Sequence, residues 1–199
     1  MTRNAASTSG PAAGGPASAG SSASVEEAAC LAERAEEILG GYLQPGRWAT
    51  ARVARRFLQS KDLERVLSLY MGAMESDPQE PAYPWNLASS LDRLRLSDLA
   101  LTFIRRAIRV ADETGDREWS GADAHLAWAD IALHAGEPEV AEIAIERARR
   151  IDPHAPFERY LRRLRREPAD RWTPYRLERS QLPNRILDEL SALETAEDR

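Results

Sequence analysis

Apolar residues recur along most of this chain with the spacing of one face of a helix. From Val25 to Leu39 they form a single stripe with glutamates between them, and this period predicts a helix that ends at Gly40 and Gly41. After a turn at 44–46, helical segments separated by short turns continue to Arg166, and none alternates with the period of two that marks a strand. The sequence therefore predicts an all-α fold.

One set of residues repeats within the helical region. Val66, Tyr70, Ala73 and Asp77-Pro78 recur 34 residues later, and again 41 residues after that. The later copies are Ala100, Ile104, Ala107 and Ala111-Asp112, and then Ala141, Ile145, Ala148 and Asp152-Pro153. Ala54, Ala88 and Ala129 each precede a copy by 12 residues. Because antiparallel helices approach closely where both present small side chains, we expect these alanines to face Ala73, Ala107 and Ala148.

These residues resemble the tetratricopeptide repeat family, whose unit is a helix–turn–helix of 34 residues. Trp85 to Ala88 look like the start of its motif, and Ala148 to Pro153 look like its end. The resemblance implies an α-solenoid of three units at 47–80, 81–121 and 122–155. Residues 25–46 are then expected to form an N-terminal helix that packs on the open end of the solenoid. Residues 156–199 are expected to form its C-terminal capping helices. The seven extra residues of the second unit predict longer helices rather than a new loop.

In this family a concave groove, lined by the first helix of each unit, binds peptides. Carried over by position, the resemblance places the groove at Trp48, Arg52, Arg55, Trp85, Asn86, Ser89, Arg93, Asp123, Asp130 and His134. The Asn86 amide both donates and accepts hydrogen bonds, as a peptide backbone requires; capping or solvating its helix is the alternative interpretation. Leu126 and Asp130 replace the basic residues with which some relatives bind a terminal carboxylate. A ligand with acidic and basic parts, or an apolar segment between Trp48 and Trp85, therefore fits better.

Composition excludes several classes of protein. The 199 residues include 27 basic and 32 acidic side chains, a net charge of −5 that argues against a protein devoted to nucleic acid. A single cysteine, Cys30, excludes an internal disulfide, and we expect it to be a small buried residue of its helix. No run approaches the roughly 18 apolar residues of a membrane span. Residues 1–24, rich in Ala, Ser, Gly and Pro, predict a disordered tail, with a plastid leader as the alternative.

Arginines are densest in the predicted cap, at Arg162, Arg163, Arg165 and Arg166. A solvated helix face explains this basic patch, and docking of nucleic acid or of an acidic partner is the alternative. The three histidines show no metal-binding spacing, and the chain has no nucleotide-binding or nucleophile motif. We therefore expect no cofactor, no metal and no enzymatic activity.

These observations favour a protein-binding adaptor, expected to be bacterial from its alanine and arginine usage and to be cytoplasmic. Two alternatives remain. A regulatory sensor would bind a small peptide in the groove, or control a transcription or pathway protein, with the connection at 114–121 as its moving part. A structural module would self-assemble through exposed helix edges. The sequence does not identify the partner or the oligomeric state.

Overall fold

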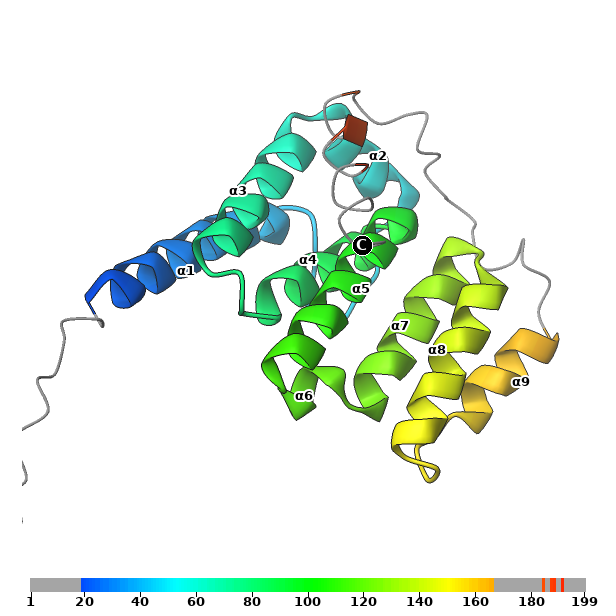
Figure 1. Cartoon of the computed structure of the whole chain (residues 1–199). Helices are drawn as coiled ribbons and strands as arrows, with labels where there is room; N and C mark the ends of the chain where they lie inside the picture. The colour runs from blue at the N-terminus through cyan, green and yellow to red at the C-terminus, as the bar shows by residue number, and fades with distance from the viewer. Residues whose placement is uncertain (1–18, 167–183, 185–186, 189–190, 192–199) are drawn as a thin grey trace, which may run out of the picture.

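The predicted all-α class is confirmed by a computed structural model of the chain, which describes residues 19–166, 184, 187–188 and 191 (Figure 1). This part of the chain contains helices and turns and no strand. The helices are α1 (Ala19–Gly40), α2 (Ala51–Gln59), α3 (Asp62–Ser76), α4 (Ala82–Arg93), α5 (Ser97–Thr114), α6 (Arg117–Ser120), α7 (Ala122–Ala135), α8 (Pro138–Ile151) and α9 (Glu158–Arg166). None of these helices is long and apolar enough to cross a membrane.

The N-terminal helix is longer than the sequence predicts. Helix α1 begins at Ala19, so residues 19–24, which were expected in the disordered tail, are helical. Alanine is the strongest helix former, and serines can extend a helix that is already nucleated. The rest of the predicted tail and most of the last predicted helix, including Ile186, Leu190 and Leu193, lie outside the described residues.

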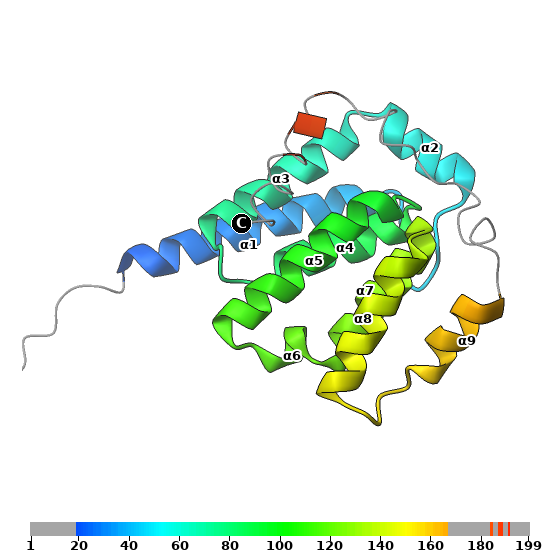
Figure 2. The same cartoon turned by 45° about the vertical axis from the view of Figure 1, so that its right-hand side comes forward.

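Helices α4 and α5 form one closely packed pair, and α7 and α8 form a second (Figures 1 and 2). The small residues predicted to face one another, Ala88 with Ala107 and Ala129 with Ala148, are all completely buried. Their positions fit the expected close approach of the two helices within each pair. Helix α5 packs on α7 and thereby joins the two pairs.

The first helix pair differs from the prediction. Helix α3 packs along α1, and its contact with α2 is slight, so Ala54 of α2 does not pair with Ala73. The Tyr42 hydroxyl donates to Asp62, and the Tyr70 hydroxyl donates to Glu36, which fixes the two helices as antiparallel. A short α2 of 9 residues cannot cover the 15 residues of α3, whereas α1 has 22.

Helix ends follow the local sequence. Helices α3 and α8 end before Asp77-Pro78 and Asp152-Pro153, as predicted, because the residue before a proline avoids helical geometry. The extra length of the second unit lengthens α5 to 18 residues, against 15 in α3 and 14 in α8, and also adds the short helix α6. The prediction of longer helices alone was therefore incomplete.

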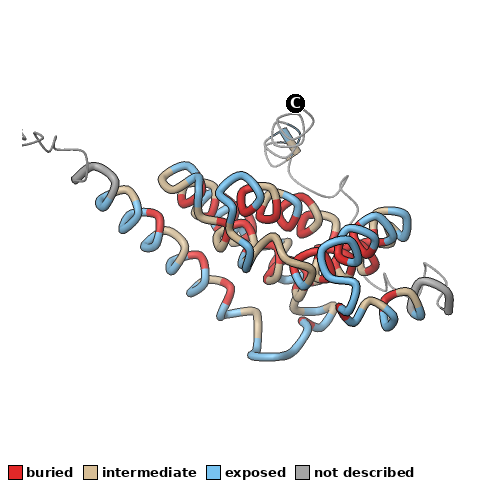
Figure 3. Tube along the Cα trace, turned by 60° about the horizontal axis from the view of Figure 1, so that its bottom comes forward, coloured by how far each residue is buried: buried red, intermediate tan, exposed pale blue. Residues whose placement is uncertain are grey.

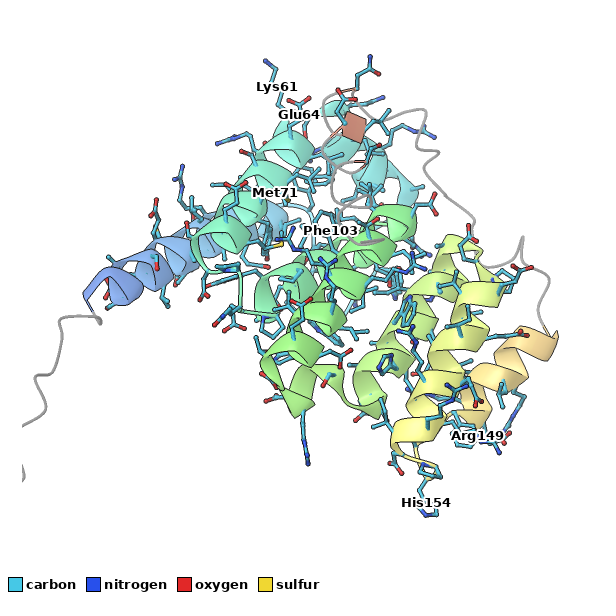
Figure 4. All side chains as sticks on the ribbon, viewed as in Figure 1. Lys61, Glu64, Met71, Phe103, Arg149 and His154 are labelled. Atoms are coloured by element: carbon cyan, nitrogen blue, oxygen red, sulfur yellow. The ribbon has the colours of Figure 1, made fainter. Side chains whose placement is uncertain are left out.

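A continuous apolar core runs from α1 to α9. Figure 3 shows its buried residues where helices face one another. Phe103 lies among the central helices, whereas Lys61 and Glu64 project from one edge (Figure 4). Trp128 is 4% exposed, as its packing position predicted, but Cys30 is exposed. The prediction for Cys30 was wrong because α1 buries the stripe of Ala28, Ala35 and Leu39, and Cys30 lies outside it.

Gly72 offers a test of the α1–α3 pair. A Cβ added there would lie 3.2 Å from Leu31 Cδ1 of α1. We expect Gly72→Leu to lower the free energy of unfolding by about 1–3 kcal/mol through overpacking. Gly72→Ala should be nearly neutral, because the helix propensity of alanine, about 1 kcal/mol better than glycine, offsets the tight contact. Urea unfolding followed by circular dichroism measures both. Ser68→Leu, at an exposed position one turn earlier, is the control; an equal effect of both leucines would contradict the pairing.

Candidate functional site

Polar and aromatic side chains meet where α4 and α7 end. The Nδ1 atom of His134 lies 3.0 and 3.2 Å from the two carboxylate oxygens of Asp92, which is buried. Asp92 also accepts a hydrogen bond of 2.7 Å from the Ser97 hydroxyl. In the tautomer with its proton on Nδ1, His134 donates this hydrogen bond to the Asp92 carboxylate. Asp92 therefore joins the ends of two neighbouring helices.

The segment between α1 and α2 lies against these helix ends. The Trp48 ring meets the His134 ring edge-on, with 4.7 Å between the centroids. The Arg93 guanidinium donates to the backbone carbonyls of Gln44 and Arg47, and the Ala49 N–H donates to the Arg93 carbonyl at 2.8 Å. Arg93, a predicted groove residue, therefore fastens this segment to α4 with its side chain.

Arg95 also packs against Trp48. Its guanidinium carbon lies 4.8 Å from the centroid of the Trp48 ring, and its Nε atom is buried without a described hydrogen-bond partner. Its backbone has a φ of 70°, the left-handed conformation that Gly115 and Gly136 adopt at the ends of α5 and α7. A non-glycine residue there costs on the order of 1 kcal/mol, and such strain clusters at functional sites. The sequence analysis did not select Arg95. The available signal was the end of α4, where no glycine is present to adopt the left-handed conformation.

Asp123 and Asp130 lie on the side of α7 that faces α9. A hydrogen bond with the Tyr160 hydroxyl raises the pKa of Arg159 on α9, and the carboxylates of Asp130 and Asp123 add to this effect. The two predicted groove acids therefore act on the same arginine. The structure thus brings together an acidic part of α7 and a basic part of the cap.

The remaining predicted groove residues are more scattered. Trp85 meets Trp119 of α6 edge-on at 5.0 Å, at the start of α4, roughly 12 Å along the helix from the Trp48 site. Asn86 is exposed and Ser89 is half-buried. Arg52 and Arg55 are exposed on α2, and neither side chain forms a hydrogen bond or an ion pair with a described residue. Of the predicted basic patch, Arg162 is exposed, and the side chains of Arg163, Arg165 and Arg166 lie outside the description.

No group of three or more His, Cys, Asp or Glu side chains in the described part of the chain could hold a metal ion. His125 is another buried polar residue, 4% exposed on α7. Burial lowers the pKa of His125 below its usual 6.5, and Arg147 adds to this effect, whereas Asp112 opposes it.

The lowered pKa of His125 predicts a loss of stability in acid. Between its folded pKa and about 6.5, the unfolded chain binds the proton that the folded chain does not. The contribution of His125 is therefore fully present above pH 6.5 and is lost as the pH falls through the folded pKa. Urea unfolding at a series of pH values should show a steeper decline for the wild type than for His125→Gln. Parallel pH profiles would contradict this assignment.

Comparison with family models, curated proteins and solved structures finds no match to this chain. The resemblance to tetratricopeptide repeats therefore rests on its residues and spacings.

Proposed function

We propose that this protein binds an extended or helical peptide segment of a partner protein across α4 and α7, in a stack of helix pairs similar to tetratricopeptide repeats. The observation that supports this proposal most is the environment of the Trp48 side chain. Its side chain is 39% exposed, although His134 and Arg95 hold it in place and Arg95 adopts a strained backbone to do so. Exposed, rigidly held aromatic side chains contribute much of the energy of protein interfaces.

Neighbouring polar side chains suit a peptide ligand. Asn86 is exposed on α4 and offers both a donor and an acceptor to a peptide backbone. Asp123 and Asp130 on α7 suit a basic side chain, and Arg159 beside them suits an acidic one. The proposed ligand therefore carries an apolar residue for Trp48 and side chains of both charges for α7 and α9.

The experiment is affinity capture from the native host with the full chain immobilised, followed by quantitative mass spectrometry. We expect Trp48→Ala/Asn86→Ala to weaken capture of the specific partner strongly, because loss of a central interface tryptophan costs about 2 kcal/mol, a factor of about 30 in Kd. Circular dichroism melting shows whether both proteins are folded at the capture temperature.

The matched control is Glu64→Gln/Ser68→Ala, which changes two exposed side chains of α3 away from this face. It should retain the wild-type set of captured proteins. If the Trp48→Ala/Asn86→Ala variant also retains that set at wild-type yield, the α4–α7 face is not the binding surface and the proposed function is wrong.

A further inference from the structure

Two arginines from different helices converge on one buried indole, that of Trp128. The guanidinium carbon of Arg105 on α5 lies 5.6 Å from the centroid of the Trp128 ring, and that of Arg147 on α8 lies 5.2 Å from it. Trp128 belongs to α7, which packs against both α5 and α8. The two positive charges are therefore at most about 11 Å apart, on the surface where these helices meet, and interact with the same aromatic ring.

Neither arginine is neutralised by a described carboxylate. Two other arginines of the same helices have such partners: Arg109 lies 3.9 Å from Glu113, and Arg150 lies 3.3 Å from Glu146. The exposed Arg149 of α8 lies over the Phe157 ring instead. Arg105 and Arg147 are exposed as well, but their contacts in the described part of the chain are with Trp128. Two guanidiniums over one ring, neither of them paired with a described carboxylate, suit carboxylate groups of a ligand.

Two buried polar atoms close to these arginines have no hydrogen-bond partner among the described residues. They are Nε1 of Trp128 and Nδ1 of His125. Both side chains are 4% exposed, and their rings lie 5.9 Å apart. Leaving a buried polar group without a partner destabilises a folded protein, so such groups are uncommon and need an explanation. Asp112 also faces His125, but it does not pair with either ring.

Aliphatic side chains continue the same surface along α8. Ile143 is 52% exposed and Ile151 is 50% exposed, and each is four residues from Arg147, which places all three on one flank of the helix. In the described part of the chain, the other large apolar side chains with such exposure are Val25 and Trp48. We call the surface formed by Arg105, Ile143, Arg147 and Ile151 around the buried Trp128 ring the Trp128 face.

We propose that the Trp128 face is a second binding surface, which takes a segment of a partner protein rich in carboxylates and aliphatic side chains. The carboxylates pair with Arg105 and Arg147, and the aliphatic side chains cover Ile143 and Ile151. This surface is separate from the one proposed above: Trp128 and Asp130 are two residues apart on α7, hence roughly 200° apart around the helix. The protein would then join two partners from opposite sides of α7.

The test uses a fluorescein-labelled helical peptide of Glu, Leu and Ala, and the same peptide with every Glu replaced by Gln. Fluorescence anisotropy with the full chain should show that the Glu peptide binds at least about ten-fold more tightly than the Gln peptide. Arg105→Gln/Arg147→Gln should weaken binding of the Glu peptide at least about ten-fold, because it removes both charges with which the carboxylates of the peptide pair.

Arg109→Gln/Arg150→Gln is the matched control, since it removes the same charge from the same two helices but from arginines that already have acidic partners. It should bind the Glu peptide as the wild type does, and so should Trp48→Ala. Equal losses in both arginine variants, equal affinity for the Glu and Gln peptides, or no binding of either would overturn the proposal. A labelled single-stranded oligonucleotide that binds more tightly than the Glu peptide, and is lost with Arg105 and Arg147, would also overturn it.

Discussion

Replacing Phe103 with alanine is expected to lower the free energy of unfolding by about 3–5 kcal/mol, the range measured for phenylalanines removed from protein cores. Phe103 is 1% exposed on α5, the helix that packs against both α4 and α7 (Figure 4). The truncation removes apolar contacts and leaves a cavity that rigid neighbouring helices cannot fill. For a chain of this size the midpoint of thermal unfolding should fall by roughly 6–20 °C.

Phe103→Leu is the control for this experiment, because a substitution that keeps most of the volume costs less than about 1.5 kcal/mol. Calorimetry of the three proteins would show whether the helix pairs unfold together. A loss below about 1 kcal/mol for Phe103→Ala would mean that α5 is not the centre of the core.

Asp92→Ala should cause the second large loss, about 2–3 kcal/mol, since hydrogen bonds to a charged group are worth about 1.5–3 kcal/mol and Asp92 makes such bonds to both Ser97 and His134. Its burial means that water cannot replace them easily. Denaturant unfolding measures the loss. Because His134 supports Trp48, we also expect faster tryptic cleavage after Arg47 in the Asp92→Ala protein.

The control is Asp123→Ala, which removes an exposed carboxylate from α7 and should change stability by less than about 0.5 kcal/mol. A double-mutant cycle with His134→Ala isolates the Asp92–His134 pair, for which residues in direct contact give a coupling of about 0.5–3 kcal/mol. No measurable coupling would show that Asp92 acts through Ser97 alone.

Local features of this fold could be predicted from the sequence. Helical periodicity predicted the all-α class, and the Asp-Pro pairs marked the ends of α3 and α8 correctly. The burial of Trp128 followed from its place in the repeat. These predictions succeeded because helix formation and helix termination depend on residues within a few positions of each other.

The candidate site was less predictable. Position in the repeat selected Trp48 and His134, which do meet. It also selected Arg52 and Arg55, which are exposed on α2 and whose side chains form no hydrogen bond or ion pair with a described residue. Asp92 and Arg95 were missed, although they hold Trp48 and His134 in place. Their roles depend on the segment between α1 and α2, which lies against the end of α4. No local sequence pattern predicts this contact.

The sequence by itself determined that the chain is helical and that α3 and α8 end at their Asp-Pro pairs, because these features depend on short-range periodicity and turn residues. Only the tertiary structure decided that α3 pairs with α1 instead of its neighbour α2, and that Arg105 and Arg147 meet over Trp128. Helix pairing depends on total complementary area and close approach, so the longer apolar stripe of α1 and the small Gly72 outweighed proximity in the chain.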